Sequence, residues 1–105
     1  MHLPLVTILL AALLCPVPAA AQSTVEAQAR RLINSQGCKA CHLFDGSGGS
    51  AGPDLSKVGA RLSKEQLHSL LVNRRHRHAA GRIADFSHLQ SEELDALTTF
   101  LSQRR

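Results

Sequence analysis

Aromatic residues are scarce in this 105-residue chain: Trp and Tyr are absent, and there are only three Phe. Proteins that bind single-stranded nucleic acid usually stack the bases on aromatic side chains beside basic ones. Although the formal net charge is +4, the composition therefore argues against nucleic-acid binding. No alternating apolar and polar run of four or more residues predicts a β-strand, and internal repeats are also missing. The length allows one domain at most.

Charge is absent from the long apolar run at residues 3–21. Pro16 and Pro18 interrupt this run, whereas a membrane-spanning helix needs about 20 unbroken apolar residues. A shorter apolar stretch followed by small residues, here Ala19–Ala21, is typical of a secretory signal peptide. We predict that residues 1–21 are a signal peptide, which leaves residues 22–105 as a periplasmic domain without a membrane anchor. The alternative is that the segment is retained as an anchor.

Residues 22–105 are few for a stable hydrophobic core, and chains of this size often depend on a disulfide, a metal or a cofactor. Apolar residues recur at the helical period in three stretches, which predicts helices at 24–35, at 63–73 and from Ser91 to near the C-terminus. Glycine and proline are frequent in 43–60, where they predict a loop. The expected fold class is all-α with long loops.

Capping signals mark the starts of the first two helices. Ser23 or Thr24 is expected to cap the first, while Ser63 and Gln66 have the spacing of a capping box at the second. His68 lies among the apolar positions of this second helix, so we expect a hydrogen-bonded histidine in the core or at its boundary.

The sequence Cys38-Lys39-Ala40-Cys41-His42 is the attachment signature of a c-type haem. Two thiols at this spacing can each form a thioether to one of the two vinyl groups of a porphyrin, and the following imidazole can then bind the iron. Three other interpretations compete: a thiol-redox motif, a structural disulfide, and a zinc site completed by His76 and His78. The thiol-redox motif normally lies between a strand and a helix. A disulfide at this spacing would close a very small loop and stabilise the fold little, and a zinc site with two cysteines from one turn is rare.

Four segments together resemble the small, class I, monohaem c-type cytochromes. They are QGCKACH at 36–42, GPDLS at 52–56, GARLS at 59–63 and FSHLQSEELDAL at 86–97. The resemblance implies a cytochrome c fold, in which three main helices and long loops surround one covalently bound haem c and the first and last helices cross.

The resemblance also implies roles for individual residues. Cys38 and Cys41 would hold the haem, and His42 would be the proximal iron ligand. The carbonyl group of Pro53 would accept the other ring N–H of His42 and fix its tautomer. Arg61 would lie near the haem propionates, with a solvated surface arginine as the alternative.

One feature departs from the family. The position of the usual axial methionine holds Ile83, and the only Met in the chain is Met1, within the predicted signal peptide. We therefore expect no methionine ligand on the iron. His78 is the candidate distal ligand and His76 the alternative, and a third possibility is an open iron site behind Ile83. His88 is expected to face solvent.

These features predict an exported electron carrier that is not an enzyme, acting freely or as the haem subunit of a larger oxidoreductase. The alternative is a haem-based gas-binding or sensor protein with an open distal site. A run of positive charge in the same loop favours a redox partner with an acidic docking surface. It is formed by Arg74, Arg75, Arg77 and Arg82.

Overall fold

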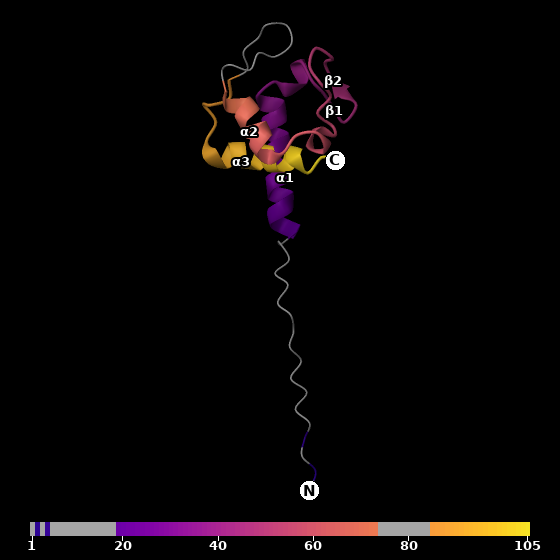
Figure 1. Cartoon of the computed structure of the whole chain (residues 1–105), viewed down its shortest axis with the longest axis vertical. Coiled ribbons are helices and arrows are strands. Elements are labelled where there is room, and N and C mark those ends of the chain that lie inside the picture. Colours follow the sequence, from indigo (N-terminus) through magenta and orange to yellow (C-terminus); the bar gives the residue numbers. More distant parts are fainter. Residues whose placement is uncertain (1, 3, 5–18, 74–84) are drawn as a thin grey trace.

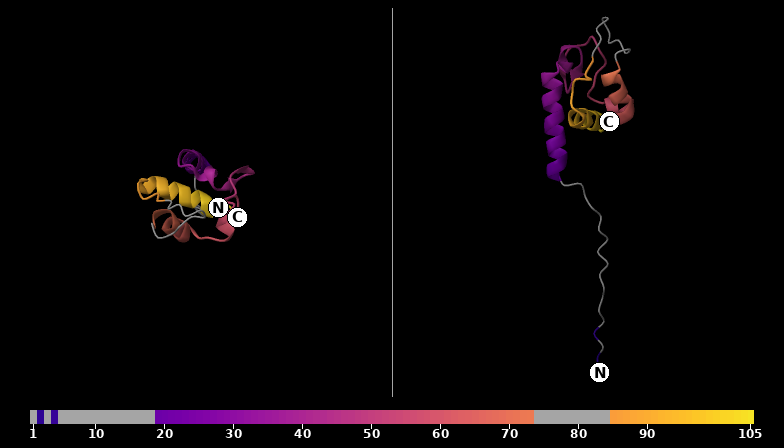
Figure 2. Two further views of the ribbon diagram at one scale, coloured as in Figure 1. Left: turned by 90° about the horizontal axis from the view of Figure 1, so that it is seen from above. Right: turned by 90° about the vertical axis from the view of Figure 1, so that its left-hand side faces the viewer.

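A computed structural model describes residues 2, 4, 19–73 and 85–105. Its elements are, in chain order, α1 (Ala19–Ser35), the 3₁₀ turn η1 (Cys38–Ala40), strands β1 (Leu43–Phe44) and β2 (Ser47–Gly48), the 3₁₀ turn η2 (Val58–Ala60), α2 (Lys64–Val72) and α3 (Ser91–Ser102). Helix α3 crosses α1 and packs against α2 (Figure 1). Figure 2 shows α3 between the other two helices. In the described part of the chain, no helix has the length and apolar character needed to cross a membrane.

Helix α1 begins earlier than the sequence predicted. It includes Ala19–Ala21, because alanine has the highest intrinsic helix propensity. Ser23 and Thr24 are therefore not caps: both lie inside the helix, where their hydroxyl groups donate to the carbonyl oxygen of Ala20. The first buried residue of α1 is Ala29, so the helix packs against the domain only from its middle onward.

Helix α2 has the predicted capping box. The backbone N–H of Gln66 donates to Ser63 Oγ at 3.1 Å, and the N–H of Ser63 donates to Gln66 Oε1 at 2.9 Å. The expectation for His68 is wrong, because its side chain is exposed. Leu67, the preceding residue, is the one that points into the core, and a neighbouring position on a helix faces about 100° away from it.

Helix α3 begins at the predicted Ser91. Residue Gln90 precedes it, and its backbone N–H donates to Glu93 Oε1 at 3.0 Å. Glu92 and Glu93 lie in the first turn, where negative charge is favoured by the helix dipole.

The segment predicted as an irregular loop contains a small hairpin. Leu43 pairs with Gly48 and Phe44 with Ser47 in antiparallel register. The connecting Asp45 and Gly46 have φ angles of 49° and 80°, as a two-residue Asp-Gly hairpin turn requires. Strands of two residues are too short to show the alternation by which strands are predicted, which explains why the sequence did not reveal them.

A charged and aromatic cluster joins α1, the hairpin and the C-terminal residues. The rings of Phe44 and Phe100 lie 6.1 Å apart, and the guanidinium groups of Arg30 and Arg104 lie over both rings at 5.1–5.7 Å. Asp45 forms ion pairs with Arg30 and with Arg104. The hairpin that follows His42 is thereby fixed to the crossing of α1 and α3.

The hydrophobic core lies among the three helices and the hairpin. Its buried residues are Ala29, Leu32, Ile33, Phe44, Val58, Leu67, Leu89, Leu94, Leu97, Phe100 and Leu101. Several partly buried residues pack against this core: Cys38, Leu55, Leu62, Leu71, Val72 and Phe86. We call this set of six partly buried residues the apolar wall.

Candidate functional site

The Cys-x-x-Cys-His segment forms a single tight turn after α1. Gly37 has a φ of 73°, a left-handed conformation that glycine adopts without steric cost and that commonly ends a helix. In the turn that follows, the carbonyl of Cys38 accepts hydrogen bonds from the N–H of Cys41 at 3.3 Å and of His42 at 2.9 Å. One turn of backbone therefore holds both thiols and the imidazole.

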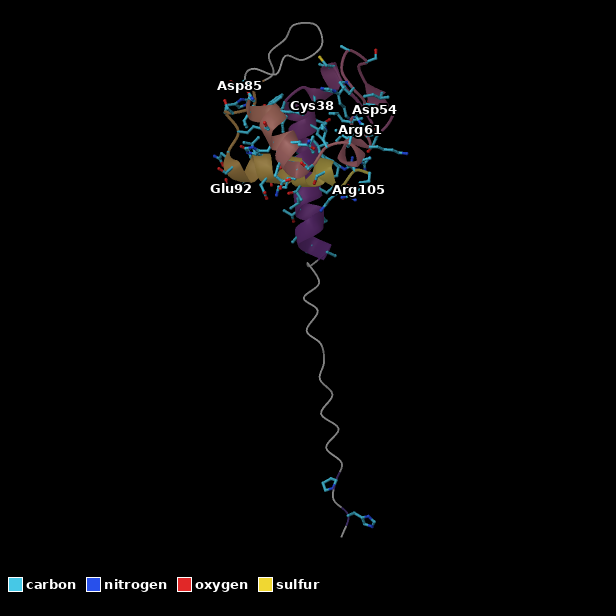
Figure 3. The ribbon with its side chains drawn as sticks, in the orientation of Figure 1. Cys38, Asp54, Arg61, Asp85, Glu92 and Arg105 are labelled. Carbon is cyan, nitrogen blue, oxygen red and sulfur yellow. The ribbon has the colours of Figure 1, made fainter. Side chains whose placement is uncertain are left out.

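Both cysteines of this turn carry free thiols and are half-buried. Cys38 packs against the core as part of the apolar wall, and burial raises the pKa of its thiol above the ordinary value. Figure 3 shows Cys38 at the end of the domain away from the start of α1. The Cys38 thiol therefore lies at the boundary between the core and solvent, a position suited to attachment of an apolar cofactor.

The imidazole of His42 is oriented by the Gly-Pro segment. Its Nδ1 lies 2.7 Å from the carbonyl oxygen of Pro53. Because a carbonyl can only accept, Nδ1 carries the proton in this contact, and the lone pair of the neutral ring is on Nε2. The structure thus contains the hydrogen bond that the family resemblance implied. It fixes the tautomer in which the ring lone pair, and with it the capacity to bind a metal, is on Nε2.

Gly52 allows this arrangement because it has no side chain. Its N–H donates to the carbonyl of Cys41 at 2.7 Å. A Cβ atom placed on it would lie 2.5 Å from Cε1 and 2.8 Å from Nδ1 of His42, which is well inside van der Waals contact. Sequence reasoning used Gly52 only as part of a family motif and did not assign it this role.

Two earlier glycines also let the loop approach the motif. The N–H of Gly49 donates to the carbonyl of Lys39 at 2.9 Å. A Cβ atom on Gly49 would lie 2.5 Å from the carbonyl oxygen of Ala40, and one on Gly48 would overlap the carbonyl oxygen of His42. The glycine content that predicted a loop therefore has a specific use, which is backbone packing against the Cys-x-x-Cys-His turn.

As well as Cys38, the apolar wall includes residues at the end of α2. Leu71 and Val72 lie in its last turn, and the N–H of Phe86 donates to the carbonyl of Leu71 at 2.9 Å. The chain before residue 74 and the chain after residue 84 are thereby joined beside the wall. The fold thus supplies half-buried apolar side chains, two thiols and an oriented imidazole, which are the kinds of group that a covalently attached porphyrin needs.

Arg61 lies at the surface near the Gly-Pro segment. Its guanidinium Nη2 donates to the carbonyl of Asp54 at 3.1 Å, and both residues are exposed (Figure 3). The pKa of Asp54 is lowered, first by hydrogen bonding to Ser56, whose N–H lies 2.8 Å from Oδ1, and further by the charges of Arg61 and Lys57. The position of Arg61 is thus fixed by the same loop that orients His42.

The candidate distal residues lie outside the described part of the chain. His76, His78 and Ile83 all fall within residues 74–84, as do the four arginines of that loop. His88 is exposed as predicted, and its Nε2 lies 3.0 Å from Gln36 Oε1.

The described residues contain no group of three or more potential metal-ligating side chains. The zinc interpretation depends on His76 and His78, which are not among them.

A family model described as "Cytochrome c" matches residues 26–105. The chain belongs to the cytochrome c family. The three helices are accordingly those of a cytochrome c fold, and Cys38 and Cys41 are consistent with the covalent haem c that this domain implies. Cytochromes c function in haem-based electron transfer and are typically electron carriers rather than enzymes. Among curated proteins, no significant sequence match is found.

Proposed function

We propose that this cytochrome c is a periplasmic monohaem carrier that moves single electrons between redox partners, freely or as the haem subunit of a larger oxidoreductase. The observation that carries the proposal is the contact between His42 Nδ1 and the Pro53 carbonyl. It places the ring proton on Nδ1, so Nε2 would be the nitrogen that binds the iron, in the same turn of chain as the two thiols. The haem supplies a one-electron iron couple when it is bound.

In this proposal the protein attaches, orients and shields its cofactor. Cys38 and Cys41 would hold it through thioethers, and Nε2 of His42 would bind its iron. Pro53 acts through its backbone carbonyl. Leu62 and Phe86 are half-buried members of the apolar wall, and in this proposal they would exclude water from one side of the haem and so lower the local dielectric constant.

The distal ligand in our proposal is His78, with His76 as the alternative. This assignment is supported by the sequence, which has no Met except Met1, and by the hydrogen bond between the N–H of Phe86 and the carbonyl of Leu71. That bond brings the two ends of the intervening segment to the edge of the apolar wall. Two imidazoles would give a lower reduction potential than a histidine and a methionine.

Electron paramagnetic resonance of the ferric protein and of His78→Ala and His76→Ala variants tests the distal ligand. We expect a low-spin spectrum in the wild type and a high-spin signal in His78→Ala. A high-spin change only in His76→Ala would move the assignment to His76. A wild-type protein that is high-spin and binds carbon monoxide readily when reduced would instead favour the gas-binding alternative, with an open site behind Ile83.

Arg61 is proposed to lie near the haem propionates, because the Asp54 carbonyl fixes its guanidinium at the edge of the loop that orients His42. Removing a positive charge near the iron favours the ferric state, so Arg61→Gln should lower the midpoint potential. An unchanged potential would identify Arg61 as an ordinary surface residue.

Residues 1–21 are proposed to be a signal peptide and residues 22–105 the cytochrome c domain. Helix α1 contributes its first buried residue at Ala29, so cleavage after Ala21 would leave every core contact intact. N-terminal sequencing of the protein from a periplasmic extract should begin at Gln22. A chain that retains residues 1–21 in the membrane fraction would show that the segment is an anchor.

The redox partner is proposed to carry an acidic docking surface. The support is the run of arginines at 74–82 and the net charge of +4. Long-range attraction between opposite charges raises association rates, and salt screens it. The electron-exchange rate with the native partner should therefore fall as ionic strength rises. A rate that is independent of salt would contradict an electrostatic docking surface.

A further inference from the structure

The side chain of Arg104 connects two segments that follow the Cys-x-x-Cys-His turn. Its Nε donates to the carbonyl of Ser56 at 3.2 Å, and its Nη2 forms an ion pair with Asp45. The guanidinium group also lies over the rings of Phe44 and Phe100, at 5.2 and 5.6 Å from their centroids. One half-buried arginine is therefore in contact with both the hairpin and the segment that follows the Gly-Pro sequence.

The two segments are also bonded directly to each other. The N–H of Asp45 donates to Ser56 Oγ at 2.8 Å, and the N–H of Leu55 donates to the carbonyl of Leu43 at 2.9 Å. Because Arg104 bonds to Asp45 and Ser56, its guanidinium group closes one end of this row of contacts.

The other end of the row is the contact that orients His42. Its Nδ1 donates to the carbonyl of Pro53, two residues before Leu55, at 2.7 Å. The N–H···O distances of protein hydrogen bonds extend from about 2.7 to 3.2 Å, so this bond is at the short end of the range. A shift of the Pro53 segment away from the ring would lengthen and weaken it. The bond therefore depends on where residues 53–56 are held.

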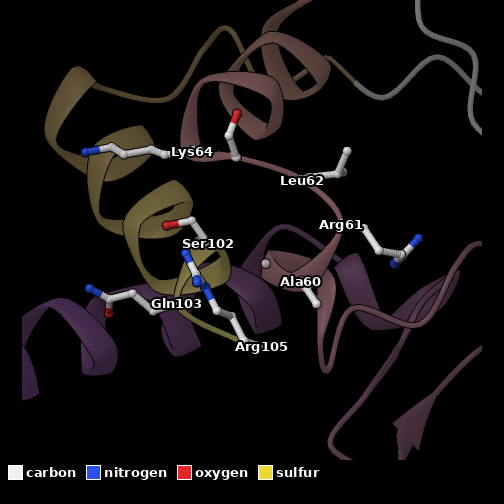
Figure 4. Close-up of a pocket in the computed structure, with 9 residues that line it drawn as sticks. Ala60, Arg61, Leu62, Lys64, Ser102, Gln103 and Arg105 are labelled. Atoms are coloured by element: carbon white, nitrogen blue, oxygen red, sulfur yellow. The ribbon is translucent and has the colours of Figure 1, made fainter.

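Arg104 is itself fixed by the end of α3. Its N–H donates to the carbonyl of Leu101 at 3.2 Å, and its carbonyl accepts from the N–H of Gly59 at 2.8 Å. A Cβ atom on Gly59 would overlap the carbonyl group of Ser102. The end of α3 is thus in direct contact with η2, as Figure 4 shows at Ser102. The guanidinium group therefore links the loop that orients the imidazole to the packed end of α3.

We propose that Arg104 is a positioning residue for the proximal histidine, an inference that rests on the proposed role of His42 as an iron ligand. Through Asp45 and Ser56, Arg104 holds the carbonyl of Pro53 against His42 Nδ1. A hydrogen bond from the other ring nitrogen increases the basicity of a ligating imidazole, and a more basic ligand favours the ferric state of the iron. Arg104 thereby lowers the reduction potential of the haem.

Arg104→Lys tests position separately from charge. Lysine keeps the positive charge but lacks the planar fork that reaches Asp45 and the Ser56 carbonyl together. The ¹⁵N-labelled, haem-loaded protein is reduced under carbon monoxide, so that its iron is low-spin. We expect the Nδ1–H of His42 to exchange with solvent about 2- to 10-fold faster than in the wild type, the ratio that corresponds to the net contribution of one hydrogen bond. The amide of the buried Leu97 reports global unfolding and should change less. The midpoint potential, measured without carbon monoxide, should rise.

Arg105→Lys is the matched control. Arg105 is exposed and lines a groove beside Gly59–Lys64 (Figure 4). The same substitution there should change neither the exchange rate nor the potential. If Arg104→Lys were poorly folded, Asp45→Asn would replace it, because it removes the ion pair from the other side and should also accelerate the exchange of the His42 Nδ1–H.

An acceleration in Arg104→Lys no greater than that at Leu97, with an unchanged potential, would show that Arg104 stabilises the fold without positioning His42. The ferric spectrum of His42→Ala tests the proposed function separately. A spectrum identical to that of the wild type would refute His42 as an iron ligand, and the inference with it. A changed spectrum in His42→Ala, together with unchanged Nδ1–H exchange in both Arg104→Lys and Asp45→Asn, would refute only the role of Arg104.

Discussion

Gly52→Ala tests the packing that orients the proximal histidine. The φ angle of Gly52 lies outside the left-handed region, so alanine imposes no backbone strain and the effect is purely steric. The new methyl group would lie 2.5–3.1 Å from three atoms of the His42 ring, where ordinary carbon contacts are about 3.5–4.0 Å. The ring or the Gly-Pro segment must therefore move by about 1 Å.

The expected cost has two parts. Forcing a methyl group into a packed site costs about 1–3 kcal/mol. Loss of the hydrogen bond between His42 Nδ1 and the Pro53 carbonyl adds about 0.5–1.5 kcal/mol. Urea unfolding of the haem-loaded protein, followed by circular dichroism, should show a total loss of about 2–4 kcal/mol. The ferric spectrum should change as well, because His42 is displaced.

Pro53→Ala is the matched control. The acceptor for His42 is a backbone carbonyl, so alanine retains it and loses only the rigidity of the proline ring, about 0.4–1 kcal/mol. Its spectrum should stay like that of the wild type. If Gly52→Ala were as stable as the wild type and had the same spectrum, the proposed role of Gly52 in orienting His42 would be refuted.

Three further variants test other parts of the structure. Leu97→Ala, at a side chain that is 1% exposed, should reduce the free energy of unfolding by about 2–5 kcal/mol, and a loss below about 1 kcal/mol would contradict its place in the core. Asp45→Asn keeps a residue that tolerates a positive φ but removes the ion pairs to Arg30 and Arg104. In urea unfolding, this variant should lose about 1 kcal/mol of unfolding free energy relative to the wild type, and the loss should be smaller in high salt. Because the pKa of Asp54 is lowered in the folded state, its carboxylate stabilises the fold above its ordinary pKa, and this contribution disappears as pH falls through the lowered value. The difference in unfolding free energy between wild type and Asp54→Ala should therefore decrease in acid. A difference that grows as the pH falls would show that the pKa of Asp54 is not lowered by folding.

The helices were predictable because each has a local signal. The capping box of Ser63 and Gln66 fixed the start of α2, and the period of Leu94, Leu97 and Leu101 defined the buried face of α3. Helix α1 was predicted too short, because its first residues are held by alanine propensity rather than by an apolar face or a cap. His68 was predicted to be buried but is exposed, because it is one position after the buried Leu67 and therefore faces a different side of the helix.

The candidate haem-attachment residues could be proposed from spacing alone, since Cys38, Cys41 and His42 all lie within one turn of the chain. The close approach of Gly52 to the His42 ring was not, because it brings together residues ten positions apart and depends on how the loop folds back. The contact between Gly59 and the end of the chain was hidden for the same reason. The N–H of Gly59 and the carbonyl of Arg104 are far apart in the sequence and meet only when α3 packs beside η2.

Intact mass spectrometry of the purified, exported protein tests the central claim most directly, because attachment through Cys38 and Cys41 changes the covalent mass of the chain. The account predicts one haem per chain that survives denaturation and no thiol available to an alkylating reagent. A polypeptide of unmodified mass with two reactive thiols would contradict it.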